Sequence, residues 1–176
     1  MIQPSEHHKV RRQHIKCTIV PYIPAFKARY KTLNSEWLTK YFEIEDIDER
    51  LLADPEQEIL KKGGYIFFAC VDGEAVGTCT LLQHGQGSFE LSKMCVTEAF
   101  QGMGIGEQLV DEAIAKACEM DAARLVLFTN EKLQAAVALY KKKGFKIINP
   151  SMMLVSGYKR ESLCMCLDLP GKTVNV

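Results

Sequence analysis

The chain has 176 residues, of which 47% are hydrophobic and 25% are charged, and this is enough apolar material for one globular domain with a proper core. Its 22 Lys and Arg residues balance 22 Asp and Glu residues, and zero net charge argues against nucleic acid as a general partner, because that binding needs a concentrated excess of cations. No apolar signal segment opens the chain and no apolar run is long enough to cross a bilayer, so we expect a cytoplasmic protein without membrane contact.

The seven cysteines are an odd number, and no two of them have CxxC spacing. Most lie in apolar runs, where a thiol behaves as a small core residue, and this usage favours a reducing compartment over a disulfide framework. The His7-His8 pair has no third ligand at a matching spacing, so we expect no metal site.

The first third of the chain predicts one strand followed by two helices. Residues 1–14 are polar and are expected to form a flexible tail, and a strand is expected over 15–22. Pro24 suits the first turn of a helix whose apolar stripe has helical spacing, at Phe26, Tyr30, Leu33, Trp37 and Tyr41. A shorter helix is expected over 48–60, interrupted at Pro55.

Three antiparallel strands are expected next. Residues 65–71 and 74–82 flank Asp72-Gly73, a pair that favours the tight turns of β-hairpins. A second reversal at 85–87 leads into a strand that begins near Phe89.

This third strand runs into a glycine-rich loop, Gln-Gly-Met-Gly-Ile-Gly at 101–106, and the loop opens a helix. Alternate glycines let backbone N–H groups crowd together, and the helix N-terminus adds donors and a positive dipole end. Such a loop predicts a pocket for phosphate oxygens. It is not a P-loop, because Gly106 is followed by Glu107. It is not a dinucleotide fingerprint either, which from Gly102 or Gly104 would need a small residue at 107 or 109.

The remaining chain predicts a strand, a helix and two more strands. The apolar run 125–128 is typical of a strand covered on both faces, and it should lie parallel to the strand that precedes the crossover helix. Asn130 is expected to cap the next helix, which ends at Gly144, and the last strands are expected over 145–149 and 163–169.

The predicted fold class is therefore α/β with a mixed sheet, in the order β-α-α-β-β-β-α-β-α-β-β. The N-terminal half should be mostly antiparallel, with a parallel pair at the centre. We expect a single domain over 15–169, followed by a short tail at 170–176.

Two motifs carry a family resemblance. The glycine loop contains Q-x-x-G-x-G, formed by Gln101, Gly104 and Gly106. A later stretch reads Asn, a few residues, Ala, a few residues, Leu-Tyr, three residues, Gly-Phe, between Asn130 and Phe145. Both patterns, in this order, resemble the acetyl-CoA loop and the later motif of the GNAT superfamily of N-acetyltransferases. The resemblance covers residues 15–169 and implies a small single-domain member of that superfamily, with acetyl-CoA as co-substrate and no metal.

The resemblance also implies how coenzyme A would be held. Backbone amides of the loop would bind the pyrophosphate: Gln101, Gly102, Met103, Gly104, Ile105 and Gly106. The main chain at the end of the preceding strand would pair with the pantetheine arm, at Met94, Cys95 and Val96. The Cys95 amide would face the thioester oxygen. Asn130 either hydrogen-bonds the pantetheine or serves only as a helix cap.

Two residues are candidates for the proton transfers. An alkyl ammonium has a pKa of about 10, so a base or a water path to bulk solvent is needed. Glu90, six residues before Val96, lies where several superfamily members place a catalytic glutamate; the alternatives are an exposed strand carboxylate and a chain of waters. Tyr140 matches the tyrosine that protonates the leaving thiolate, although it also continues the apolar stripe of its helix and is compatible with a core position.

The acceptor stays open. Residues 41–46 mix aromatic and acidic side chains that could seat a cationic amine or form a solvated helix face, whereas Lys159 and Arg160 could recognise a carboxylate. We expect direct acetyl transfer to a primary amine of a small molecule or peptide. A non-catalytic acyl-CoA-binding module and a protein-lysine acetyltransferase are the alternatives, and a homodimer is compatible with each.

Overall fold

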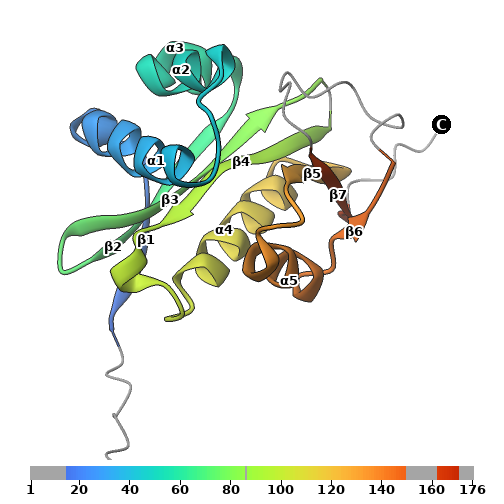
Figure 1. The fold of residues 1–176 in the computed structure, drawn as a ribbon. Coiled ribbons are helices and arrows are strands. Elements are labelled where there is room, and N and C mark those ends of the chain that lie inside the picture. Colours follow the sequence, from blue (N-terminus) through green and yellow to red (C-terminus); the bar gives the residue numbers. More distant parts are fainter. Residues whose placement is uncertain (1–14, 86, 150–161, 171–176) are drawn as a thin grey trace, which may run out of the picture.

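A computed structural model describes residues 15–85, 87–149 and 162–170. Their strands form one seven-stranded sheet in the order β1-β2-β3-β4-β5-β7-β6 (Figure 1). The strands are β1 (Cys17–Pro21), β2 (Tyr65–Val71), β3 (Glu74–Gln83), β4 (Ser88–Val96), β5 (Arg124–Thr129), β6 (Lys146–Ile147) and β7 (Leu163–Asp168). The helices are α1 (Lys27–Tyr41), α2 (Asp46–Ala53), α3 (Pro55–Glu58), α4 (Ile105–Glu119) and α5 (Gln134–Lys142), with 3₁₀ turns η1 (Pro24–Phe26), η2 (Leu60–Lys62) and η3 (Glu98–Phe100).

The sheet is mixed, as the sequence predicts. Among the described strands, β4 and β5 pair in parallel and every other neighbouring pair is antiparallel. Helix α4 makes the crossover that a parallel pair requires. The predicted fold class and order of elements are confirmed.

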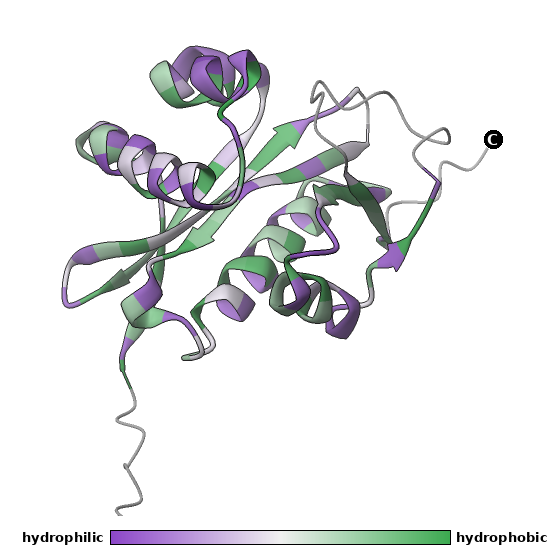
Figure 2. Ribbon diagram, in the orientation of Figure 1, coloured by the Kyte–Doolittle hydropathy of each residue, from purple (hydrophilic) through white to green (hydrophobic). Residues whose placement is uncertain are grey.

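Helices cover both faces of the sheet (Figure 1). Helices α1 to α3 close one face over a core that includes Tyr30, Leu33, Leu51, Ile66 and Phe68. Helices α4 and α5 lie on the other face, over a core that includes Leu81, Leu91, Leu109, Leu125 and Met165. Figure 2 shows hydrophobic residues alternating with hydrophilic ones along α4, in keeping with one buried and one solvated side.

Strand β4 contains a bulge next to its C-terminal end. Thr78 lies opposite Cys95 and Thr80 opposite Ser92, so two steps on β3 match three steps on β4. Lys93 lies within this extra stretch and has a φ of 47°, a left-handed conformation that is uncommon for a residue other than glycine. The bulge changes the direction of the side chains that follow it.

Three local expectations need correction. The second helix begins at Asp46 rather than 48, because Glu45 and Asp48 form a capping box, and it is divided into α2, α3 and η2. Asn130 does not cap α5: its Oδ1 accepts the N–H of Lys132 at 2.9 Å and closes a turn of its own, while Leu133 is the cap residue. Strand β6 is shorter than the 145–149 expected.

Within the described residues, none of the helices is both long and apolar enough for a bilayer crossing. The expected tails at 1–14 and 170–176 and the Lys159-Arg160 pair fall outside the described residues, except for Pro170.

Candidate active site

A cleft of about 540 Å³ lies between β4 and β5 and is walled by α1 on one side and α5 on the other. This volume is typical of a small-molecule site. The cleft exists because the two parallel strands stop pairing early: their last partners are Leu91 and Leu127. Beyond this pair, β4 continues from Ser92 to Val96, and all five of these residues line the cleft. An extended ligand could therefore pair with this main chain as an added strand would.

The glycine loop opens beside the cleft. Gly102 and Gly104 have φ angles of 74° and 79°, and a Cβ added at either would meet no atom within 4 Å, so conformation rather than crowding requires glycine there. Gly104 is the N-cap of α4, so the first-turn amides of this helix follow it directly. Together these features leave a bare main-chain cradle of the kind that fits phosphate oxygens.

The structure divides the predicted loop residues into two groups. Gln101, Gly102 and Gly106 line the cleft, and the Gln101 side chain donates from Nε2 to the Val96 carbonyl oxygen at 2.9 Å. Met103 has an exposed side chain and Ile105 a buried one that packs in the core. The roles predicted for Met103, Gly104 and Ile105 concern only their main chain, and those roles stay predictions.

Tyr140 lies at the inner wall of the cleft and is 8% exposed. Its hydroxyl donates to the Met94 sulfur at 3.6 Å, and its ring packs edge-on against Phe145 with centroids 5.8 Å apart. Burial raises the pKa of the Tyr140 phenol above its ordinary value. The hydroxyl therefore keeps its proton at neutral pH. Tyr140 is both a packed residue and a lining residue of the cleft, and its role as the acid stays a prediction.

Glu90 also lines the cleft and is 4% exposed, which excludes the exposed strand carboxylate considered from the sequence. Its Oε2 lies 2.8 Å from Nε2 of His84, a residue to which the sequence assigned no role. The hydrogen bond to Glu90 raises the pKa of His84, although partial burial opposes the shift. The sequence hinted at this contact only through the chain reversal expected at 85–87, because such a turn brings residues on its two sides close together.

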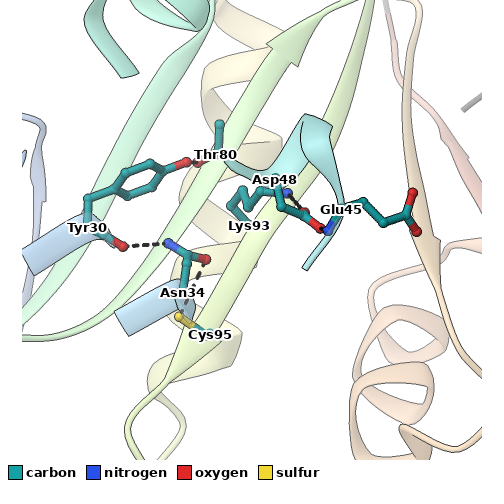
Figure 3. A network of polar contacts seen from close by, with 7 residues as sticks. All are labelled: Tyr30, Asn34, Glu45, Asp48, Thr80, Lys93 and Cys95. Atoms are coloured by element: carbon teal, nitrogen blue, oxygen red, sulfur yellow. Dashed lines mark hydrogen bonds and ion pairs between the residues drawn. The ribbon is translucent and has the colours of Figure 1, made fainter. Parts of the chain in front are cut away.

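Cys95 is buried at the end of β4, and burial raises the pKa of its thiol to about 12. Its Sγ contacts Oδ1 of Asn34 at 3.8 Å, and the Asn34 amide donates to the Tyr30 carbonyl oxygen at 2.9 Å (Figure 3). A thiolate is therefore scarce at neutral pH, which disfavours Cys95 as a covalent nucleophile.

A buried ion pair joins the bulge of β4 to α2. Nζ of Lys93 lies 2.7 Å from Oδ1 of Asp48, with side chains 3% and 0% exposed (Figure 3). The other oxygen of Asp48 accepts the Glu45 N–H at 3.0 Å. The sequence analysis assigned no role to Lys93 or Asp48, because nothing local relates two residues 45 positions apart. Lys93 lines the cleft, so this pair fixes part of its wall.

Aromatic side chains form the wall of the cleft on the α1 side. Trp37, Tyr41 and Phe42 line it, and the Trp37 ring centroid lies 5.6 Å from each of the other two. The carboxylates that follow them in sequence are not among the lining residues. Several acidic residues of this region have local roles instead, in the α2 capping box and in ion pairs of Glu56 with Lys27 and of Glu58 with Lys62.

Asn130 lines the cleft, although its side chain is used in the turn described above. Within the described ranges, no group of three or more His, Cys, Asp or Glu side chains is arranged to hold a metal ion. The seven cysteines are all free thiols in the structure.

The fold of this chain, with its mixed sheet and the glycine loop beside the parallel pair, matches those of solved acetyltransferases. The structure of an acetyltransferase of the GNAT family from Staphylococcus aureus Mu50 superimposes with a TM-score of 0.79, at 22% identity over 87% of this chain and 99% of that one. The family model for the Acetyltransferase (GNAT) family matches residues 29–145, and the chain belongs to this family.

Sequence relatives agree with this assignment. The uncharacterized N-acetyltransferase Rv2669 of Mycobacterium tuberculosis is 34% identical over 118 residues, which are 67% of this chain and 71% of the relative. The uncharacterized N-acetyltransferase YvbK of Bacillus subtilis is 33% identical over 103 residues, 57% of this chain and 66% of the relative, just under two thirds of its length. The structure of yncA from Salmonella typhimurium, solved with its cofactor acetyl-CoA, has a TM-score of 0.70 at 21% identity, over 90% of this chain and 96% of that one.

Proposed function

We propose that this acyltransferase transfers the acetyl group of acetyl-CoA directly to the primary amine of a small molecule or peptide. The observation that carries the proposal is the cleft itself. It gathers the glycine loop, the unpaired end of β4, Glu90 and Tyr140 around one cavity. The relatives named as N-acetyltransferases and the acetyl-CoA bound by yncA support the choice of reaction.

Each group in the cleft suits one part of this reaction. The left-handed glycines and the start of α4 would hold the pyrophosphate, and the main chain of 94–96 would hold the pantetheine. Holding both substrates in one cleft removes much of the entropic barrier to their reaction.

Two buried side chains of the cleft, those of Glu90 and Tyr140, would carry out the proton transfers. Glu90 would take a proton from the ammonium, the amine nitrogen would then form the amide bond, and the Cys95 amide would donate to the carbonyl oxygen. The nitrogen of the tetrahedral intermediate would lose its second proton to water, and the bond from carbon to sulfur would then break to leave the amide. The protonated Tyr140 hydroxyl would give its proton to the leaving sulfur and regain one from water.

Thiol release from acetyl-CoA, measured against a panel of primary amines, tests the proposal. We expect turnover with a subset of amines and initial-rate patterns of a ternary complex. Tight binding of coenzyme A by calorimetry, without thiol release from any amine or peptide, would indicate a non-catalytic acyl-CoA-binding module instead. Labelling of proteins in a lysate by labelled acetyl-CoA, without activity on small amines, would indicate a protein-lysine acetyltransferase.

A further inference from the structure

The contact between Glu90 and His84 joins the inside of the cleft to its outside. Glu90 lines the cleft and its side chain is 5% exposed, whereas His84 is not a lining residue and its side chain is 38% exposed. The two are held by the turn between β3 and β4, in which the His84 N–H donates to the Ser88 carbonyl oxygen at 2.9 Å. Nε2 and Oε2 lie 2.8 Å apart, a distance at which a proton can pass.

A carboxylate alone is a weak base for the proposed reaction. An alkyl ammonium has an ordinary pKa of about 10.4 and a carboxylic side chain one of about 4.3, so a carboxylate alone would take the proton from only about one amine in a million at equilibrium. An imidazole, with an ordinary pKa of about 6.5, is roughly a hundredfold stronger as a base. His84 therefore supplies the basicity that the carboxylate lacks.

We propose that His84 is the proton acceptor behind Glu90, and that the two form a relay from the acceptor amine to bulk solvent. This inference rests on the proposed function. An N–H bond of the ammonium breaks, its proton passes to the Glu90 carboxylate and from there to Nε2 of a neutral His84, and a new N–H bond forms on the imidazole. Glu90 ends as a carboxylate, and the amine keeps the electron pair for the acetyl carbon. Acceptance at Nε2 requires the Nδ1–H tautomer of His84, so the imidazolium loses its Nδ1 proton to water, and proton exchange with solvent then restores the accepting tautomer. His84 acts only through Glu90.

The electrostatic surroundings are compatible with this relay. Among the described residues with a resolved pKa shift, His84 from the β3–β4 turn and Cys164 from β7 respond to the charge of Glu90. Burial, the neighbouring Cys166 and Glu90 all raise the pKa of the Cys164 thiol, so it stays neutral at the pH of interest. Lys93, three residues along the strand, directs its ammonium to Asp48. His84 is thus the group beside Glu90 that can change charge near neutrality.

The His84→Gln variant tests the relay, because the amide can hydrogen-bond Glu90 but cannot accept the proton. At pH 7 we expect kcat to fall by about 10²-fold or more, the usual range for general-base catalysis, with the KM for acetyl-CoA unchanged. The loss of kcat should shrink as the pH approaches the pKa of the acceptor amine, because more of the amine is then already deprotonated. It should also be small for an acceptor amine of low pKa. A structural role would lower kcat equally at every pH and for every amine.

A spectroscopic readout accompanies the kinetics. The chain has four histidines, so loss of one imidazole resonance in His84→Gln identifies His84 by NMR. In Glu90→Gln, the pKa of His84 should fall, because the charge that stabilises the imidazolium is gone. An unchanged His84 titration in Glu90→Gln, or an active wild type with the same pH profile as His84→Gln, would overturn the relay alone. If the wild type acetylates no amine, the relay and the proposed function fail together.

Discussion

The ammonium of Lys93 lies 2.7 Å from the carboxylate of Asp48, and this contact ties the bulge of β4 to the N-terminal turn of α2 inside a wall of the cleft. Both charges are excluded from water, so each depends on the other for compensation.

Removal of either partner of the Lys93–Asp48 ion pair should lower the free energy of unfolding. Asp48→Asn removes the carboxylate that the buried Lys93 ammonium contacts at 2.7 Å, and we expect the free energy of unfolding to fall by about 3–5 kcal/mol. Lys93→Met should also be strongly destabilising, whereas the double variant should cost much less than the sum of the two, since no uncompensated charge is left. Urea denaturation of all four proteins measures the coupling. The exposed Lys62–Glu58 pair is the control, and its removal should leave stability almost unchanged. Additive costs at Lys93 and Asp48 would contradict the interpretation.

Tyr140→Phe removes the hydroxyl but keeps the packed ring. We expect kcat to fall by about 10²-fold or more, with little change in stability or in the affinity for coenzyme A. Steady-state kinetics and calorimetry provide the measurements. Tyr65→Phe is a matched control, because the Tyr65 hydroxyl also donates to a methionine sulfur, Met120 at 3.1 Å, and does not line the cleft. Equal turnover in Tyr140→Phe and Tyr65→Phe would exclude Tyr140 as the acid.

The glycine loop can be tested with alanine. At Gly102 and Gly104 an added Cβ finds open space, but the left-handed backbone costs about 1–2 kcal/mol for a residue with a side chain. If the loop relaxes out of this conformation, the dissociation constant for coenzyme A should rise by roughly 5–30-fold, the equivalent of that strain. Gly73→Ala, in the β2–β3 turn, has a φ of 84° and equally open space, so it imposes the same strain away from the cleft. Calorimetry should find weaker coenzyme A binding only in the loop variants.

Low pH should weaken the ion pairs that connect Glu107 of α4 to Lys142 and Lys143 at the end of α5. Hydrogen bonds from Lys142 and then Lys143 lower the pKa of Glu107 to about 2. Because the folded-state pKa lies below the ordinary value of 4.5, this stabilisation is complete above pH 4.5 and is lost as the pH falls toward 2.

The variant Glu107→Gln should therefore have a lower Tm than wild type at pH 6, and the difference should vanish near pH 2. Thermal melts followed by circular dichroism across this range measure it, and added salt should reduce the difference because the pair is partly exposed. Glu49→Gln, exposed in the first turn of α2, controls for the helix dipole. A Tm difference that is the same at pH 6 and pH 2 would contradict the assignment.

The sequence predicted most of the fold because its signals were local. Asp72-Gly73 defined the first hairpin, and both glycines of the loop that adopt positive φ were identified from their alternate spacing. Tyr140 and Glu90 were found through a resemblance that covers nearly the whole domain, and both line one cleft.

The contacts that sequence analysis missed depend on three-dimensional proximity. Lys93 and Asp48 belong to different elements, 45 residues apart in the chain, and Lys93 lies in the bulge of β4. A bulge leaves no clear mark on a pattern of period two. The prediction that Asn130 caps α5 was wrong for a different reason. Asparagine closes a local turn as readily as it caps a helix, and the same sequence pattern is compatible with both uses.

The early end of pairing between β4 and β5 gives the sheet an edge in its interior. Edges at the margin of a sheet attract strands from other chains, and proteins protect them with charges, prolines or short length. Here α1 and α5 wall the unpaired end of β4 on its two sides, as a covering helix protects an edge strand elsewhere. The same walls that define the cleft therefore limit pairing of this edge with a foreign chain.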